Sequence, residues 1–319
     1  MGKKAKDKRD IYYRKAKEEG YRARSAYKLL QIDEEFNIFE GVDRVVDLCA
    51  APGSWSQVIS KRLKEKGLDI TNTKRLISVD LFEMAAIEGC TIIKGDITRE
   101  KTVQEIQEVF EGEPSQLVVS DGAPDILGDH DFDQFVQHQL VLAALNIAIR
   151  LLSPGGTFVA KVFRGKDINL LHRQIKMVFS DVYCSKPKCS RNSSIEGFVV
   201  AKNFLGKQAI GLTSDRLNLW DALTTINHLK NFQDIYYCDE EEDIDDIIPF
   251  VACGKNEEFD ADMNYSLNTI VTDKKLDKDE ESKDNQVEGA YKYIEPRQKP
   301  IDPPYKVFLA KRNELNNNQ

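Results

Sequence analysis

Short apolar runs alternate with amphipathic segments along the first two hundred residues of the chain. Five runs are rich in β-branched residues and have the length of strands: 44–50, 75–81, 91–97, 116–123 and 156–163. Segments with apolar residues at helical spacing lie between them, at 55–66, 99–110 and 134–152. Such alternation predicts an α/β fold with a doubly wound parallel sheet. A helix over 168–180 and strands near 182–185 and 197–204 raise the expected sheet to about seven strands.

The alternating pattern weakens after residue 206, which divides the chain into two parts. We expect one α/β domain over 1–206 that begins with a basic helical segment at 1–36. A C-terminal extension would then occupy 207–319. Within it, the nearly all-polar stretch at about 270–290 is expected to be disordered, because it offers little apolar surface to bury.

Two absences limit the class of protein. No stretch approaches the roughly 18 consecutive apolar residues of a membrane helix, and the charged N-terminus lacks an apolar signal region. We therefore expect no membrane association. The six cysteines form no CxxC pair, which argues against a metal site and favours reduced thiols in a cytoplasmic protein.

The net charge of −8 hides a strong segregation of charge along the chain. Residues 1–30 hold eleven Lys/Arg against four Asp/Glu, with four tyrosines between them, whereas 239–246 hold seven acids and no cation. A basic end of this kind is typical of a nucleic-acid footprint. A solvated basic helix would show the same charge, so charge alone does not decide between the two.

Lys161 interrupts the apolar run at 157–163, which otherwise has the pattern of a buried parallel strand. A lysine is almost never fully buried unless it is paired. The sequence therefore predicts an acid partner or a catalytic role for Lys161.

Acidic residues close three consecutive strands of the expected sheet: Asp80, Asp96 and Asp121. Ligands of such sheets bind at the carboxyl ends of the strands, where the small residues of the loop at 47–55 would let a ligand approach and Asp80 would hold ribose hydroxyls. The loop lacks GxGxxG, and acids repel a pyrophosphate, which disfavours a nicotinamide dehydrogenase. A positively charged nucleoside such as S-adenosylmethionine fits better. Each aspartate taken singly could instead cap a helix.

Five separated motifs in one order resemble the FtsJ/RrmJ-like family of RNA ribose 2′-O-methyltransferases. They are YRARSAYKL at 21–29, DLCAAPGSW at 47–55, SDGAPD at 120–125, AKVF at 160–163 and SSIE at 193–196. The resemblance implies the Rossmann-like fold of S-adenosylmethionine-dependent methyltransferases. It places a catalytic tetrad on Lys28, Asp121, Lys161 and Glu196, and cofactor contacts on Gly53, Trp55, Asp80, Asp96 and Asp121. It requires no metal.

The C-terminal extension is similar to that of the eukaryotic branch of this family. The matching stretches are PFVACG at 249–254, FDAD at 259–262 with Tyr265, YKY at 291–293 and PPY at 303–305, although Lys255 departs from the usual acid. That branch methylates nucleotides 32 and 34 of the tRNA anticodon loop, so the resemblance implies tRNA as a partner. It also implies two auxiliary proteins, a helical-repeat protein for nucleotide 32 and a WD-repeat β-propeller for nucleotide 34. The alternatives are a ribosomal-RNA 2′-O-methyltransferase and a non-catalytic RNA-binding scaffold.

Roles for the individual residues follow from this chemistry. A ribose hydroxyl is a poor nucleophile, so we expect Lys161 to accept its proton or to stabilise the alkoxide. Lys28 would lower the pKa of Lys161, whereas Asp121 and Glu196 would oppose that shift and fix the ammonium. Residues expected to bind RNA are Arg22, Arg24 and Lys28 through phosphates and Tyr27 through base stacking.

Overall fold

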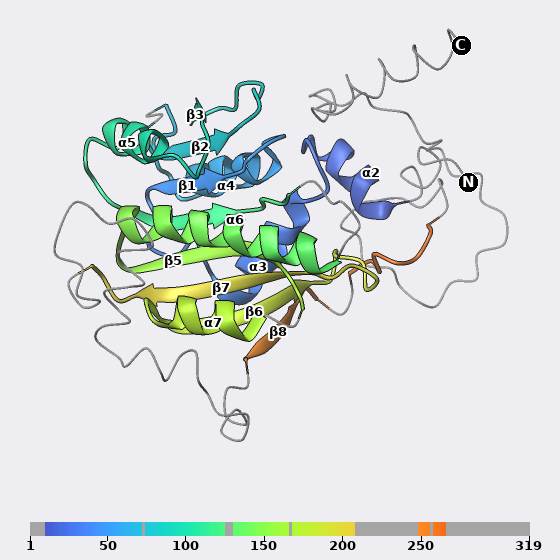
Figure 1. Cartoon of the computed structure of the whole chain (residues 1–319). Helices are drawn as coiled ribbons and strands as arrows, with labels where there is room; N and C mark the ends of the chain where they lie inside the picture. Colours follow the sequence, from blue (N-terminus) through green and yellow to red (C-terminus); the bar gives the residue numbers. More distant parts are fainter. Residues whose placement is uncertain are drawn as a thin grey trace, which may run out of the picture.

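An eight-stranded sheet organises the computed structural model, which describes residues 10–71, 74–124, 130–165, 168–207, 248–255 and 258–265 (Figure 1). The strands are β1 (Val45–Leu48), β2 (Leu76–Asp80), β3 (Cys90–Lys94), β4 (Ser115–Ser120), β5 (Leu152–Phe163), β6 (Phe179–Pro187), β7 (Glu196–Phe204) and β8 (Phe250–Cys253). The helices are α2 (Ile11–Glu18), α3 (Ala26–Phe36), α4 (Ser54–Glu65), α5 (Glu100–Val109), α6 (His130–Leu151) and α7 (Ile168–Lys176).

The strand order confirms the expected doubly wound α/β sheet. The order is β3-β2-β1-β4-β5-β7-β6-β8, and neighbouring strands from β3 to β5 are parallel. Only β7 runs antiparallel to its neighbours. The sheet has one strand more than the seven expected, because the four residues of β8 pair with β6 from beyond the alternating part of the chain.

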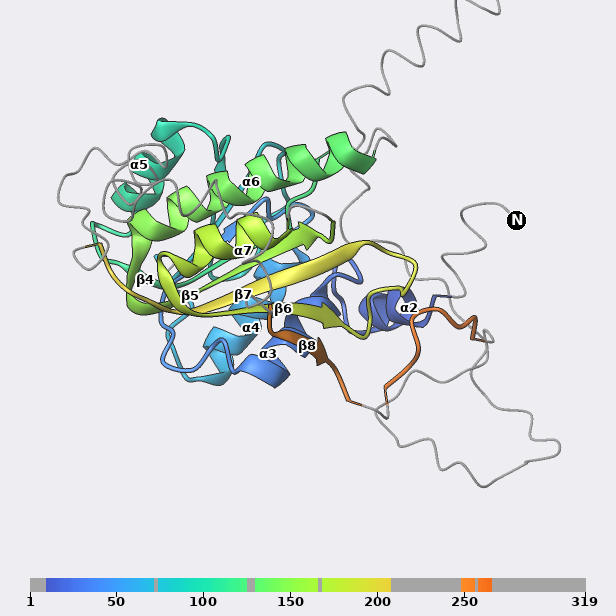
Figure 2. The same ribbon diagram turned by 60° about the horizontal axis from the view of Figure 1, so that its bottom comes forward.

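Helices cover both faces of the sheet, with α5, α6 and α7 on one face and α3 and α4 on the other (Figure 2). The alternation of side chains along β5 divides the core between these layers. Phe158 and Val162 pack in the cluster under α6 and α7, and Val159 packs in the cluster under α3 and α4. Since Lys161 shares the parity of Val159, the strand directs it to the α3 face.

Some predicted boundaries are wrong, for identifiable reasons. The strand expected to reach residue 97 ends at Lys94, because Asp96 closes a turn by accepting the Thr98 N–H at 2.9 Å. The helix expected to reach residue 180 ends at Lys176. Phe179 instead begins β6, and its ring packs at 6.3 Å from that of Phe158. Tertiary packing here overrides the local helical pattern.

The start of β5 also differs from the prediction. The sequence at 153–156 indicated a turn before the strand, but β5 begins at Leu152 and the turn lies inside it as an irregularity in its pairing with β4. Gly155 allows this with a φ of 81°.

The predictions for 239–246 and 270–290 lie outside the described residues. Within the described ranges, the helices are all too short or too polar to cross a membrane.

Candidate active site

Strand register brings the four residues of the expected tetrad to one end of the sheet. Ser120 of β4 pairs with Ala160 of β5, so the next residues along, Asp121 and Lys161, lie side by side. On the other side of β5, Lys161 pairs with Phe198 of β7, and Glu196 lies two residues before it on the same face. That face carries α3, which supplies Lys28.

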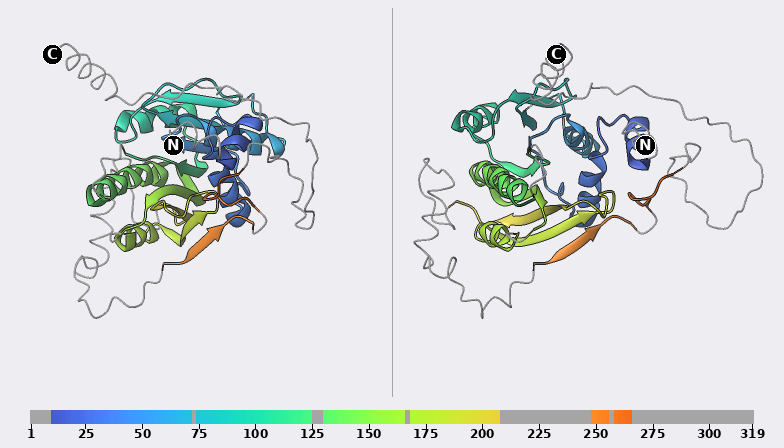
Figure 3. Two further views of the ribbon diagram at one scale, coloured as in Figure 1. Left: turned by 90° about the vertical axis from the view of Figure 1, so that its right-hand side faces the viewer. Right: turned by 45° about the vertical axis from the view of Figure 1, so that its right-hand side comes forward.

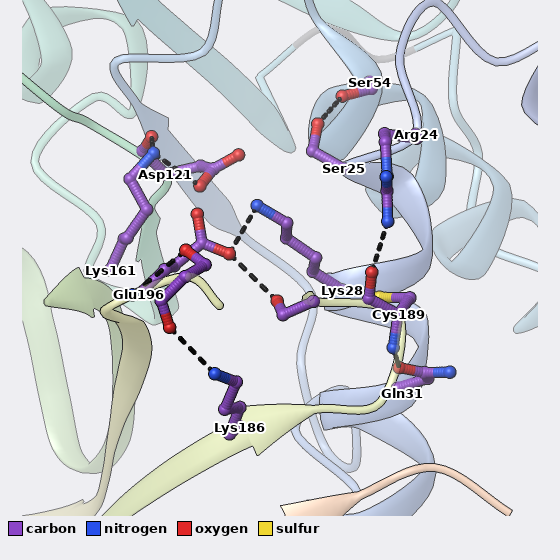
Figure 4. A network of polar contacts seen from close by, with 12 residues as sticks. Arg24, Ser25, Lys28, Gln31, Ser54, Asp121, Lys161, Lys186, Cys189 and Glu196 are labelled. Carbon is purple, nitrogen blue, oxygen red and sulfur yellow. Dashed lines mark hydrogen bonds and ion pairs between the residues drawn. The ribbon is translucent and has the colours of Figure 1, made fainter. Parts of the chain in front are cut away.

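The tetrad forms two ion pairs in a mostly enclosed space. Lys161 Nζ lies 3.0 Å from Asp121 Oδ1 and donates to the Asp121 backbone carbonyl at 2.6 Å. Lys28 Nζ lies 2.6 Å from Glu196 Oε1. The four side chains are between 11 and 19% exposed and point toward one another (Figure 4). The acid partner predicted for Lys161 is thus confirmed.

The charge on Lys28 is favoured by its surroundings. Burial alone would lower the pKa of this ammonium, but the carboxylates of Asp121 and Glu196 together outweigh it and raise the pKa above its ordinary value. Lys28 is therefore a permanent cation at neutral pH. Its Nζ also lies 5.7 Å from the centre of the Phe198 ring, which adds a cation–π contact.

Short hydrogen bonds from the β6–β7 loop orient Glu196. Ser190 Oγ donates to Glu196 Oε1 at 2.9 Å, so this oxygen serves both Ser190 and Lys28. The Ser194 hydroxyl accepts the Glu196 N–H at 3.2 Å, and Lys186 donates to the Ser194 carbonyl at 2.9 Å. The carboxylate is consequently held by the loop as well as by the strand.

Gln137 of α6 is a positioning residue that we did not predict from the sequence. Its side chain is 1% exposed, and its amide donates to the carbonyls of Lys161 at 2.7 Å and Gly122 at 3.1 Å. Gln137 therefore links the backbone of Lys161 to that of Gly122, the residue after Asp121. The available signal was its helical register with buried Val141 and Ala144.

A second group of residues shapes the loop after β1 at the same end of the sheet. Asp80 accepts the backbone N–H groups of Ala51 and Phe82, each at 2.8 Å, and so joins the loops that follow β1 and β2. Gly53 has a φ of 100°, and a Cβ there would lie 2.7 Å from both Arg22 Nη1 and Ile87 Cδ1. Only glycine fits this close approach.

The carboxyl groups of Asp47, Asp80 and Asp121 interact with one another beneath this loop. Asp47 is fully buried, and burial raises the pKa of its carboxyl to about 8, with further contributions from Asp121 and Asp80. Ser56 donates to one Asp47 oxygen at 2.5 Å, while the other has no hydrogen-bond partner among the described residues. Such surroundings fit a positively charged ligand such as S-adenosylmethionine and disfavour a pyrophosphate.

Asp96 and Trp55, which were also expected to contact the cofactor, lie in different surroundings from Asp80. Asp96 lies near the surface, where hydrogen bonds from the Thr98 N–H and hydroxyl lower the pKa of its carboxyl. The ring of Trp55 is turned into the core, and its Nε1 donates to the Ser25 carbonyl at 2.8 Å. Any cofactor contact by Trp55 would therefore come from its backbone at the start of α4, and both roles stay predictions.

The expected RNA-binding residues are engaged within the protein. Arg22 donates to the carbonyls of Pro52 at 2.9 Å and Ala86 at 2.8 Å. Arg24 pairs with Asp10 and donates to the Cys189 carbonyl. Tyr27 is 5% exposed, and burial raises the pKa of its hydroxyl. Their contacts with RNA stay predictions, and the ring of Tyr27 would have to leave its cluster to stack on a base.

The described residues contain no group of three or more His, Cys, Asp or Glu side chains arranged to hold a metal ion.

Asp47 makes stability depend on pH in a defined window. Its carboxyl has a pKa of about 8 when folded and 3.8 ordinarily, so between these values the folded protein holds a proton that the unfolded chain has lost. The free energy of unfolding should fall as pH rises through this window, by about 1.4 kcal/mol per pH unit from this group. In urea unfolding at pH 5, 6 and 7, Asp47→Asn should remove that slope, whereas exposed Asp43→Asn should keep it. Equal slopes in both variants would contradict the assignment.

Comparison with known proteins agrees with this geometry. Residues 21–204 match the family described as FtsJ-like methyltransferase. A mouse protein named tRNA (cytidine(32)/guanosine(34)-2′-O)-methyltransferase is 48% identical over 320 residues, covering 99% of this chain and 88% of the mouse protein. A ribosomal RNA large subunit methyltransferase E from Methanothrix thermoacetophila is 45% identical over 201 residues, covering 63% of this chain and 75% of its own.

The fold has a counterpart among solved structures. A crystal structure of a ribosomal RNA methyltransferase from Plasmodium falciparum superposes with a TM-score of 0.52 at 26% identity, covering 58% of this chain and 100% of that one. The family match extends over more than half of the chain and includes all four residues of the two ion pairs. The chain therefore belongs to the FtsJ-like methyltransferase family.

Proposed function

We propose that this protein is an S-adenosylmethionine-dependent tRNA ribose 2′-O-methyltransferase that acts on nucleotides 32 and 34 of the anticodon loop. The observation that carries the proposal is the meeting of the Lys28–Glu196 and Lys161–Asp121 pairs at the ends of the strands, close to the carboxyl groups of Asp47 and Asp80. The name of the mouse relative, which aligns along nearly the whole chain, supports the substrate.

The residues present can perform the transfer without a metal. S-adenosylmethionine, when bound, supplies a methyl group on a positively charged sulfur. Lys161 Nζ, which is ion-paired with Asp121, would release its own proton to water and then accept the proton of the ribose 2′-hydroxyl as that oxygen takes the methyl group. Asp121 fixes that nitrogen, while cationic Lys28 lies close enough to stabilise developing negative charge on the oxygen.

The cofactor would lie against the loop at 47–55. Asp80 and Asp96 would take ribose and base polar groups, and Asp121 would face the positive end of the molecule. This distribution matches a cationic nucleoside, since the acids that raise the pKa of Asp47 would attract it. Asp121 would thus serve cofactor and lysine together.

A ribosomal RNA substrate is the main alternative. The relative named for ribosomal RNA aligns with 201 residues, whereas the relative named for tRNA aligns with 320 and so includes the C-terminal extension. The extension therefore favours tRNA. A non-catalytic scaffold is disfavoured because a scaffold has no use for two ion pairs with so little solvent exposure.

Auxiliary proteins form the finer part of the proposal. The resemblance of the extension implies a helical-repeat protein that directs the enzyme to nucleotide 32 and a WD-repeat β-propeller that directs it to nucleotide 34. The five cysteines among the described residues are free thiols, which supports a cytoplasmic location.

Replacement of Lys161 tests the chemistry. In single-turnover methylation with saturating S-adenosylmethionine, Lys161→Ala should lose about 10²- to 10⁴-fold in rate because the proton acceptor is gone. Lys161→Arg should be equally slow, since a guanidinium keeps the charge but does not take up a proton. Lys94→Ala, at an exposed strand position, is the control. Substantial activity of Lys161→Arg would show that charge alone suffices.

Gln137 should affect the rate without touching a substrate. Gln137→Leu removes the amide that joins the Lys161 and Gly122 carbonyls, so the two ion-paired residues should lose their fixed spacing. We expect a single-turnover rate about 10-fold lower, with cofactor affinity within a factor of two. Gln139→Ala, at an exposed position of the same helix, should behave like the wild type.

Mapping of ribose methyl groups tests the substrate. In cells that lack this protein, mass spectrometry of tRNA should show loss of 2′-O-methyl groups at nucleotides 32 and 34, with other methylated riboses retained. Unchanged tRNA together with loss of a methyl group from large-subunit ribosomal RNA would favour the alternative reading.

A further inference from the structure

The segment that comprises residues 248–255 and 258–265 contacts the sheet and the active-site loop, although it lies beyond the part of the chain that matches the family. Strand β8 pairs with β6, and Lys188 of the following loop donates its N–H to the Cys253 carbonyl at 2.8 Å. Lys188 Nζ donates to the Lys255 carbonyl, also at 2.8 Å. The segment therefore holds the loop that leads to Glu196.

Gln31 of α3 connects this segment to the loop through one buried amide. The side chain is 2% exposed; its oxygen accepts the Cys189 N–H at 3.0 Å, and its nitrogen donates to the Glu258 carboxylate. A Cβ at Gly254 would lie 2.8 Å from Glu258 Oε2 and 3.1 Å from Gln31 Nε2. The amide is thus confined at both ends, and its orientation depends on Glu258.

The position of Cys189 affects the Lys28–Glu196 pair through the next residue of the loop. Next to Cys189, Ser190 donates to Glu196 Oε1, the oxygen that pairs with Lys28. Lys28 and Gln31 are one turn apart on α3, so the same face of the helix holds the loop at two points (Figure 4). A shift of Cys189 would therefore move the Lys28–Glu196 pair.

The second half of the segment, residues 258–265, forms hydrogen bonds with α2 and with the β6–β7 loop. Tyr12 of α2 donates its hydroxyl to the Phe259 carbonyl at 2.8 Å, and the Asn192 N–H donates to Asp262 at 2.9 Å. The rings of Phe259 and Tyr265 pack against the buried cluster of α2, where Figure 3 shows the segment beside the helix. The segment therefore contacts both α2 and the β6–β7 loop.

We propose that Glu258, acting through Gln31, is a positioning residue for the Lys28–Glu196 pair, and that the segment of residues 248–255 and 258–265 is part of the methyl-transfer site. Its expected effect on kcat rests on the function proposed above. Without the carboxylate, the Gln31 amide loses its acceptor in a buried place and turns, which releases the Cys189 N–H. Glu196 and Lys28 then lose their fixed position relative to the ribose.

Two substitutions of Glu258 separate hydrogen bonding from charge. Glu258→Ala removes the acceptor, whereas Glu258→Gln keeps an oxygen for the Gln31 amide. We expect Glu258→Ala to lower kcat about 10-fold, with KM for tRNA and the Kd of S-adenosylmethionine within a factor of two. Glu258→Gln should restore kcat to within a factor of two of the wild type. Met263→Ala, at a 58% exposed position of the same segment, is the control.

Hydrogen exchange in the intact protein gives a readout that does not depend on catalysis. The Cys189 N–H should exchange at least 10-fold faster in Glu258→Ala and at the wild-type rate in Glu258→Gln and Met263→Ala. Faster exchange with unchanged kcat would reduce Glu258 to a structural role and overturn the proposal, as would equal losses of kcat in the Ala and Gln variants. A wild-type protein that methylates no tRNA would refute the proposed function, while the exchange comparison would still test the coupling.

If Glu258→Ala does not accumulate as folded protein, Tyr12→Phe gives the same test. It removes the hydroxyl that donates to the Phe259 carbonyl, next to Glu258, and that also hydrogen-bonds the Gln31 side chain, and it leaves the ring packing in place. We expect kcat to fall about 3-fold with unchanged KM and faster exchange at Cys189. Wild-type kcat in a variant with faster exchange would contradict the proposal.

Discussion

A lysine on an apolar strand must be neutralised where it stands, and the Lys161–Asp121 pair meets that requirement across the ends of β4 and β5. Much of the local structure serves this contact. The parallel register sets the two residues side by side, and Gln137 of α6 links the backbone of Lys161 to that of Gly122, the residue after Asp121. Gly122 has no room for a side chain, since a Cβ there would lie 2.9 Å from Cys49 Sγ. Close packing around the pair thus keeps its geometry fixed.

A contribution to folding stability does not explain this cluster of ionisable side chains. Partly buried ion pairs often stabilise a fold no better than apolar residues would, and Asp47 adds a buried carboxyl whose pKa is raised to about 8. These groups lie at one end of the sheet, whereas two large apolar clusters pack between the sheet and its helices. Concentration of costly groups at one place is what a reacting site requires, because electrostatic preorganisation must precede the substrate.

The sequence allowed the sheet to be predicted, but not the Lys28–Glu196 pair or the directions of several side chains. The apolar period sufficed for β1 to β7, and Lys161 alone indicated an acid partner without identifying Asp121. Strand β8 was missed because four residues in a polar extension give no pattern until β6 offers them an edge. Trp55 and Tyr27 carry apolar rings with a polar end, and whether such a ring faces solvent or core depends on distant partners such as the Ser25 carbonyl.

The arginines show that the charge counted in the sequence does not indicate which side chains are engaged within the protein. The first thirty residues hold a large excess of cations, yet the positive charge available to RNA is smaller than this count. A single carboxylate, Asp10, caps α2 and also pairs with Arg24 and Arg191. Arg22 is held by carbonyls of the cofactor loop. These arginines join the N-terminal helices to the loops after β1 and β6, so the N-terminal segment and these loops share one network of hydrogen bonds. A displacement of α2 by a bound RNA would consequently reach Cys189 and the loop before Glu196 through Asp10 and Arg24.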